Sequence, residues 1–278
     1  MGLWWGTVED AGLRELVQVA AAAGFTDVSI TPAMYVAARE RGDSDAALRA
    51  LLDEHGITVA VIDPLIRGLP GIPEPEDVGP RFRSTFEHGE EDCYRVADAL
   101  GAQAMNVAHF LGGAVALEQM IDAVGGIASR ASARGLRTFV EFMPDGAIPD
   151  LATAAAVVAA IDSDDCVVML DTWHLWRCGD GVDEVRALPP RAIGAVQLSD
   201  ALDDVRGSWG SPPTRDRLLP GDGVIPLADI VDIARANRDD VLFGVEVFSR
   251  AWRTWPHEDR ARAAHVATRA LLFPSGPA

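Results

Sequence analysis

The sequence has no lysine, so all 24 of its basic side chains are arginines. Schiff-base aldolases, P-loop kinases and enolases with a lysine base all need the amine or ammonium group that is missing here. Cysteine is also scarce, and the three residues Cys93, Cys166 and Cys178 show neither CxxC nor zinc-site spacing. We therefore expect buried, unpaired thiols in a reducing compartment, which favours the cytoplasm.

Long apolar runs and positive charge are lacking as well. The longest apolar stretch, residues 151–161, is too short to span a bilayer. Glu9 and Asp10 follow soon after the start, where a signal peptide would have a basic region. With 42 acidic and 24 basic side chains, the formal net charge of -18 would repel a polyanion. We expect no nucleic-acid partner and no membrane partner.

The pattern of apolar residues predicts the fold. Hydrophobic residues make up 49% of the 278-residue chain, which is enough for a sizeable core. Short β-like runs alternate with longer helical runs, as in βαβ units around a parallel sheet. Gly24, Gly56, Gly101 and Gly135 each follow a helical run, where a residue of positive φ ends a helix. The expected strands are 2–5, 26–30, 58–62, 104–108, 137–141, 167–171, 192–198 and 241–247, and the expected helices lie near 10–23, 44–55, 84–100, 115–134, 149–162, 182–187, 226–238 and 257–272.

This order of elements predicts an α/β fold, a (β/α)8 TIM barrel that forms a single domain over residues 1–278. A doubly wound open sheet is the alternative, but no GxGxxG follows the first strand, so we expect no dinucleotide site. Two loops, residues 64–83 and 199–225, are unusually long. Both would emerge at the C-terminal ends of strands, where barrel active sites are built, and we interpret them as lids rather than surface decoration.

The last four expected strands each carry a polar residue within an apolar run near the strand end: Glu141, Asp171, Gln197 and Glu246. Adjacent strands of a barrel would bring these side chains together at its mouth. Burying carboxylates costs several kcal/mol unless a cation compensates their charge, and no lysine is present to do so. Carboxylate and amide oxygens suit Mn²⁺ or Mg²⁺ better than zinc or copper. We predict one divalent metal ion bound by these four residues, with strand-end caps or arginine salt bridges as the alternative.

At these positions the sequence resembles the xylose isomerase-like TIM-barrel superfamily, also called the sugar phosphate isomerase/epimerase family. In epimerase-like members the matching ligands are Glu, Asp, His and Glu, and both glutamates also move protons. The chain departs at the third ligand, where Gln197 replaces His, as it does in members similar to hydroxypyruvate isomerase and in some 3-dehydroshikimate dehydratases. The motifs that carry the resemblance are Val140-Glu141-Phe142, Leu170-Asp171-Thr172-Trp173-His174-Leu175, Val196-Gln197-Leu198-Ser199-Asp200, Pro220-Gly221-Asp222-Gly223 and Val245-Glu246-Val247-Phe248.

The resemblance implies an isomerase or epimerase that acts on an α-hydroxyketone, either ketose-like or a cyclic polyhydroxy ketone. The metal would stabilise the enediolate formed when Glu141 or Glu246 removes the α-proton, and the other glutamate would return a proton. Two alternatives stay open: a metal-dependent lyase of the 3-dehydroshikimate or keto-inositol dehydratase type, and a non-catalytic barrel that binds a sugar or a partner. AP endonucleases share the fold, but their histidine-rich trinuclear cluster does not match Gln197 and Arg217.

Four further residues are candidates for contact with a small carbohydrate-like substrate. His174 and His109 follow strand ends, although a structural hydrogen bond is the alternative for each. Arg217 matches an arginine that contacts substrate oxygens in epimerase-like members, with a solvated loop arginine as the alternative. Trp173 belongs to an aromatic wall that favours an apolar or ring-shaped substrate portion, with plain packing as the alternative. The wall would comprise Trp4, Trp5, Trp173, Trp176, Phe142, Met143 and Phe248. Barrels of this kind often pair, so a homodimer is possible.

Overall fold

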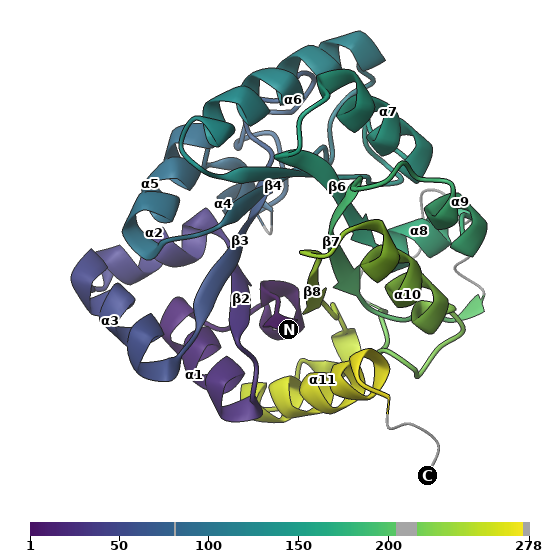
Figure 1. Ribbon diagram of the computed structural model, residues 1–278. Coiled ribbons are helices and arrows are strands. Elements are labelled where there is room, and N and C mark those ends of the chain that lie inside the picture. Colours follow the sequence, from purple (N-terminus) through teal and green to yellow (C-terminus); the bar gives the residue numbers. More distant parts are fainter. Residues whose placement is uncertain (81, 204–215, 275–278) are drawn as a thin grey trace.

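The eight strands form one closed parallel barrel in the order β1 to β8, which confirms the predicted (β/α)8 TIM-barrel fold (Figure 1). The computed structural model describes residues 1–80, 82–203 and 216–274. Each strand pairs with its neighbours in the chain, and β1 also pairs with β8 to close the ring. The strands are β1 Gly2–Leu3, β2 Asp27–Ile30, β3 Thr58–Leu65, β4 Ala104–Ala108, β5 Arg137–Glu141, β6 Cys166–Asp171, β7 Ile193–Leu198 and β8 Leu242–Val245.

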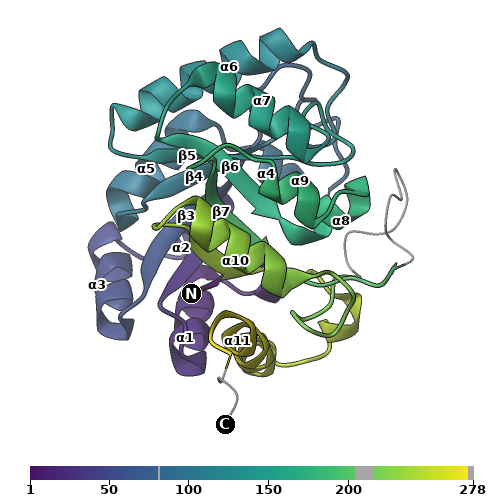
Figure 2. The same ribbon diagram turned by 45° about the vertical axis from the view of Figure 1, so that its right-hand side comes forward.

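Helices surround the barrel, as the two ribbon views show (Figures 1 and 2). Left-handed glycines end several of them as predicted: Gly24, Gly56 and Gly101 have φ of 98°, 62° and 73°, and Gly135 has φ of 75°. None of the described helices is long and apolar enough to cross a membrane. The helices are α1 Leu13–Ala23, α2 Pro32–Glu40, α3 Asp45–His55, α4 Arg83–Phe86, α5 Glu90–Leu100, α6 Leu117–Ser132, α7 Leu151–Ile161, α8 Thr172–Cys178, α9 Val182–Arg186, α10 Leu227–Asn237 and α11 His257–Leu272, with 3-10 turns η1 Trp5–Val8 and η3 Arg250–Trp252.

Two hydrophobic layers hold the barrel together. The larger layer packs the outward faces of the strands against the helices. The inner layer is small and includes Trp4, Phe139 and Met169. Trp4 fills the space beside Gly244, where an added Cβ would lie 2.0 Å from the indole. The described part of the barrel interior is therefore a packed core.

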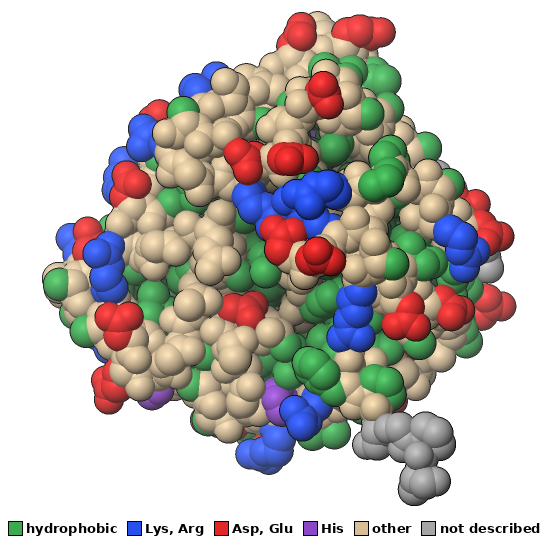
Figure 3. Space-filling model, in the orientation of Figure 1, with side chains coloured by type: hydrophobic (Ala, Val, Ile, Leu, Met, Phe, Trp, Pro, Cys, Tyr) green, Lys and Arg blue, Asp and Glu red, His purple; other side chains and the backbone are tan. Residues whose placement is uncertain are grey.

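Ion pairs occupy the end of the barrel at which the strands begin. Arg137, the first residue of β5, and Arg238 both pair with Asp240, just before β8. Figure 3 shows basic and acidic side chains side by side near the middle of the face that it presents. Active sites of such barrels lie at the opposite end, where the strands finish.

The structure differs from the predicted elements at several places. Helix α2 was not predicted, although Thr31 caps it by accepting a hydrogen bond from the Met34 amide and Pro32 follows the cap. Helix α8 was not predicted either. The helix expected near 84–100 is divided into α4 and α5 around Gly89. Strand β8 ends at Val245, so Glu246 comes directly after it.

The two long loops have different outcomes. The first loop includes Ile66 and Val78, which pack with Phe86 in a small cluster separate from the main core. Pro64, Ile66 and Phe82 line the cavity described below, so this loop lies at the mouth of the barrel, and its role as a lid stays a prediction. Of the second loop, residues 204–215 lie outside the described part of the chain. The prediction that it forms a lid stays a prediction.

Candidate functional site

A cavity of about 120 Å³ lies where the strands end, and most of the predicted site residues line it. Glu141 is the last residue of β5, Gln197 lies near the end of β7, and Glu246 follows β8. Asp171 ends β6 directly opposite Gln197 in the strand register and contacts the cavity residue Arg217. The polar lining residues are Asp63, Glu141, His174, Gln197, Arg217 and Glu246, and aromatic and aliphatic side chains surround them.

Both carboxylate oxygens of Asp171 accept hydrogen bonds from the protein itself. Its Oδ1 accepts hydrogen bonds from the amides of Trp173 and His174, so it caps the N-terminus of α8. Its Oδ2 accepts a hydrogen bond of 2.8 Å from Arg217 Nη1. The same arginine nitrogen lies 3.8 Å from Glu246 Oε2. Arg217 thus links two of the predicted ligands, which matches the alternative of an arginine salt bridge for these carboxylates.

Aromatic rings hold Arg217 in place. Its Cζ lies 5.1 Å from the ring centroid of Trp173 and 5.1 Å from that of Phe248. Such contacts favour a guanidinium over other cations. Trp173 is fully buried and does not line the cavity, so the structure places it behind Arg217 instead of against a substrate.

His174 completes a group of possible metal ligands. Ligand atoms of Glu141, Asp171 and His174 all lie within 4.8 Å of one another. His174 Nε2 is 3.6 Å from Glu141 Oε1 and 3.7 Å from Asp171 Oδ2. Burial lowers the pKa of His174 to about 4, despite the raising effect of Asp171. The imidazole is therefore neutral at pH 7, which is the form that binds metals.

The carboxylates differ strongly in their proton affinity. Burial raises the pKa of Glu141 and of Glu246 well above the ordinary value, and the charge of Asp63 adds to the effect at both. Burial likewise raises the pKa of Asp63 to about 6. For Asp171, burial acts in the raising direction but the charge and hydrogen bonds of Arg217 and His174 outweigh it, so its pKa is lowered. The surroundings therefore favour the protonated form of the two glutamates and the ionised form of Asp171.

The donor set fits a divalent cation. Four buried carboxylates surround the site, whereas the only buried cation that the described residues bring to them is Arg217. Gln197 donates through Nε2 to Glu246 Oε2 at 3.1 Å. Its carbonyl oxygen Oε1 is buried and has no hydrogen-bond partner among the described residues. An uncompensated negative charge and a free carbonyl donor are both features that a hard cation would satisfy.

Two functional candidates were missed by sequence reasoning, namely Asp63 near the end of β3 and Asn106 in β4. Asn106 Nδ2 donates to Asp63 Oδ1 at 2.8 Å and to Glu141 Oε2 at 2.6 Å. The signal was present in the sequence, because each is a polar residue within an apolar strand, as are the four predicted ligands.

His109 does not join the site. Its Nε2 lies 3.0 Å from the Pro70 carbonyl, and its Nδ1 accepts from the Ala147 amide at 2.9 Å. Both ring nitrogens thus bridge loops of the backbone, which corresponds to the structural alternative. Burial lowers the pKa of this histidine as well.

The aromatic lining of the cavity differs from the predicted wall. Trp5, Met143 and Phe248 line the cavity as expected, and Phe82 and Phe110 join them. Trp5 meets Phe248 edge to face with centroids 5.2 Å apart, and Phe82 meets Phe110 at the same distance. Four predicted members are buried elsewhere, since Trp4 fills the barrel interior and the others pack in the outer core: Phe142, Trp173 and Trp176.

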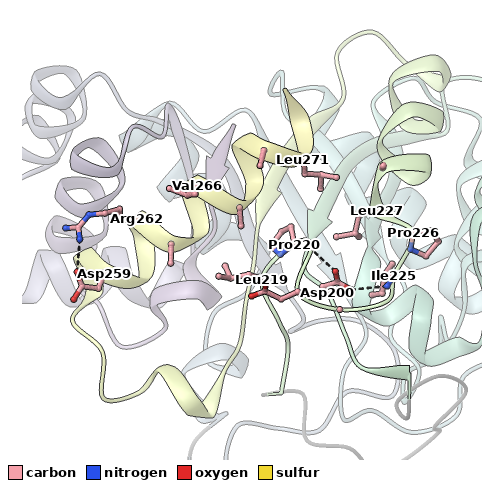
Figure 4. A pocket seen from close by; sticks show the side chains of 17 residues that line it. Asp200, Leu219, Pro220, Ile225, Pro226, Leu227, Asp259, Arg262, Val266 and Leu271 are labelled. Carbon is pink, nitrogen blue, oxygen red and sulfur yellow. Dashed lines mark hydrogen bonds and ion pairs between the residues drawn. The ribbon is translucent and has the colours of Figure 1, made fainter. Parts of the chain in front are cut away.

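A larger hollow of about 950 Å³ lies between the loop that leads into α10 and helix α11 (Figure 4). Asp200 lies at its edge and organises this loop. Its Oδ1 accepts from the Ile225 amide and its Oδ2 from the Gly221 amide, both at 3.0 Å. The side-chain hydrogen bonds of Asp200 among the described residues go to backbone amides of this loop, so Asp200 serves the loop and not the predicted ligands. The small cavity, and not this hollow, collects the ionisable groups.

Comparisons with known proteins support the same fold. A family model described as xylose isomerase-like TIM barrel matches residues 17–271. No curated protein sequence matches the chain. Among solved structures, the IolI protein with a bound zinc atom has a TM-score of 0.82 at 16% identity, covering 98% of this chain and 97% of that chain.

Two enzymes with different reactions have similar structures. D-psicose 3-epimerase from Clostridium cellulolyticum H10, solved with D-tagatose, has a TM-score of 0.67 at 17% identity, covering 98% of each chain. The probable 3-DHS dehydratase AsbF from Bacillus anthracis has a TM-score of 0.70 at 13% identity, covering 99% of each chain. At such low identities these likenesses establish a common fold.

Proposed function

The chain belongs to the xylose isomerase-like TIM barrel family, and from this premise we propose that it is a divalent-metal-dependent isomerase or epimerase of an α-hydroxyketone. The observation that carries the proposal is the pair Glu141 and Glu246. Both are buried at the same cavity, and burial together with neighbouring negative charge raises the pKa of each. A carboxyl group whose pKa is raised accepts a proton more readily than an ordinary glutamate, which suits it to proton transfer.

We assign the metal to Glu141, Asp171, Gln197 and Glu246. Ligand atoms of Glu141 and Asp171 lie within 4.8 Å of each other and of His174, so His174 is a fifth candidate donor. The oxygen-rich set favours Mn²⁺ or Mg²⁺. When bound, such a cation would polarise the substrate carbonyl and offset the negative charge that develops as the α-proton leaves. In its absence, protons on Glu141 and Glu246 reduce the repulsion between the carboxylates.

The protein residues supply the proton transfer. In epimerisation, one glutamate in its ionised form takes the α-proton and the other, protonated, returns a proton to the opposite face of the same carbon. In 1,2-isomerisation, a single glutamate takes the proton and returns it to the neighbouring carbon. Neutral His174 offers a hydrogen bond to a substrate oxygen, since its Nδ1 has no partner among the described side chains and backbone. Arg217 keeps Asp171 ionised. The small cavity and its aromatic lining limit the substrate to a small carbohydrate-like molecule.

A dehydratase is the second candidate. The rings of Trp5, Phe82, Phe110 and Phe248 line the cavity and suit a cyclic ketone, from which a β-hydroxyl would be expelled after the same proton abstraction.

The net negative charge and three free thiols support a small-molecule enzyme of a reducing compartment such as the cytoplasm.

Isotope exchange separates the candidates. The Mn²⁺-loaded protein is incubated in D₂O with a ketose and, separately, with 3-dehydroshikimate or a keto-inositol. Deuterium entering the α-position without loss of water supports the isomerase, whereas a rise in conjugated enone absorbance supports the dehydratase. Glu141→Gln and Glu246→Gln should each slow exchange by about 10²- to 10⁴-fold, and exposed Glu54→Gln is the matched control. Substrate binding without exchange or elimination would support a non-catalytic barrel.

A further inference from the structure

Asp63 is a buried carboxylate at the cavity that has no part in the proton transfer described above. Both of its oxygens accept hydrogen bonds. Oδ1 accepts from Asn106 Nδ2 at 2.8 Å, and Oδ2 accepts from Trp5 Nε1 at 3.2 Å. A longer contact of 3.5 Å joins Oδ2 to Gln197 Nε2. Donors from three separate parts of the barrel therefore converge on this one side chain.

The two amides that contact Asp63 also serve the two glutamates. Asn106 Nδ2 donates to Glu141 Oε2 at 2.6 Å, and Gln197 Nε2 donates to Glu246 Oε2 at 3.1 Å. A continuous series of contacts thus runs from one glutamate to the other with Asp63 at its centre. Each glutamate has its Oε2 held by an amide, and its Oε1 lies outside the series.

The orientation of these amides matters for the site. A side-chain amide can present either its NH₂ group or its carbonyl oxygen to a neighbour. Because Asp63 only accepts when ionised, it selects the NH₂ group of both Asn106 and Gln197. Their carbonyl oxygens are buried and without partners among the described residues, so the Gln197 oxygen stays available to a cation.

We infer that Asp63 is a positioning residue that fixes Glu141 and Glu246 relative to each other through the amides of Asn106 and Gln197. The inference rests on the proposed function, in which both glutamates hold the cation and move protons. Asparagine at position 63 could not replace the carboxylate, since it has one carbonyl and one NH₂ group. Its NH₂ would face either the Asn106 donor or the donors of Trp5 and Gln197.

The test measures Mn²⁺ binding to the full-length chain by calorimetry, with no substrate. Asp63→Asn and Asn106→Leu should each weaken binding about tenfold or more, as expected for residues that orient ligands. The double variant should bind within about twofold of the weaker single variant, because both changes break the same link. If the double variant instead loses the product of the two single fold-losses in Mn²⁺ affinity, Asp63 acts independently of Asn106, by its charge or as a ligand. The inference is then wrong. Exposed Asp164→Asn is the matched control, since its side chain is 80% accessible.

A milder variant guards against misfolding. Trp5→Phe keeps a ring and every charge but removes one donor to Asp63. It should weaken Mn²⁺ binding about two- to fivefold and alter the Mn²⁺ paramagnetic resonance spectrum. Neither effect should appear in an Asp63→Asn background, and an equal effect there would overturn the inference. A wild-type protein that binds no Mn²⁺ would overturn the proposed function as well, whereas binding with multiplying losses would overturn only the role of Asp63.

Discussion

Single residues at the mouth of the barrel were predictable when a polar side chain interrupted an apolar strand. Glu141 and Gln197 were found in this way, and the structure places both at the cavity. The partners of these residues were harder to foresee. Arg217 comes from a loop whose path no periodicity predicts, and its contact with Asp171 depends on two rings from other segments. His109 resembled His174 in sequence position, but backbone groups of two loops occupy its ring nitrogens.

Proton affinity at the site predicts a pH dependence. The pKa values of Glu141, Glu246 and Asp63 are raised in the folded, metal-free protein. At pH values between the ordinary and the raised pKa, the folded protein therefore binds more protons than the unfolded chain. The free energy of unfolding should fall as pH rises through this range. His174 has the opposite effect on the free energy of unfolding, because its pKa is lowered from 6.5 to about 4. This effect is important only below about pH 6.5.

Above pH 6.5 the opposing effect of His174 fades. The pairing of His257 with Asp10 and Glu15 is lost in the same range, so the measurement is made in a His257→Gln background. We expect the melting temperature of the metal-free protein to fall from about pH 6.5 to about pH 8. Over the same range Mn²⁺ affinity should rise and binding should release protons, because the cation displaces them. Calorimetry in buffers of different ionisation enthalpy measures the release. Affinity that does not change with pH would contradict the protonated state of the glutamates.

At the scale of elements, the sequence predicted strands better than short helices. Each strand is an apolar run bounded by turns, and this signal survives in all eight strands. Helix α8 was hidden because it begins immediately after β6, with Asp171 serving as both strand end and helix cap. Helix α2 lies between an expected strand and an expected helix, in a segment for which no element was predicted, although Thr31 and Pro32 are typical of a helix start. Local capping signals identify such helices only when they are searched for separately.

Helix α11 is joined to the start of the chain by His257, which makes a testable prediction. Its Nδ1 lies 2.5 Å from Glu15 Oε1 and its Nε2 3.0 Å from Asp10 Oδ1. Burial tends to lower the pKa of His257, but these two carboxylates outweigh it, so the pKa is raised above 6.5. The stabilisation is therefore fully present below pH 6.5 and is lost as pH rises through the raised pKa.

His257→Gln should accordingly cost at most about 1 kcal/mol of unfolding free energy at about pH 6 and almost nothing at about pH 9. Urea unfolding at the two pH values measures the difference. His265→Gln is the comparison, since burial lowers the pKa of His265 and its pH trend should have the opposite sign. An equal cost at both pH values would show that the charge of His257 does not hold α11.

For the whole molecule, the eight alternating β-like and helical runs predicted a closed barrel and left a doubly wound open sheet as the alternative; the structure confirms the barrel. A chain of βα units with right-handed crossovers can close only when enough strands are present. Closure itself depends on details that alternation does not reveal. The β1–β8 junction leaves room for Trp4 only because residue 244 is glycine.

Gly244→Ala tests that closure. Its Cβ would lie 2.0 Å from Trp4 Cε2 inside a packed core, so we expect a loss of about 1–3 kcal/mol or more in unfolding free energy. Gly125→Ala in α6 is the matched control, because its Cβ would meet Ile161 at an ordinary 3.5 Å. That change should be neutral or stabilising by up to about 1 kcal/mol, since alanine favours a helix. Chemical denaturation of both variants measures the contrast, and equal effects would show that Trp4 is not tightly packed.

The central claim concerns the cation, and anomalous scattering from crystals soaked in Mn²⁺ tests it most directly. We predict one strong peak per chain, within bonding distance of carboxylate oxygens of both Glu141 and Asp171. The position of Gln197 and Glu246 around that peak would define the remaining ligands. No peak at the mouth of the barrel, or a peak that contacts neither carboxylate, would contradict the account.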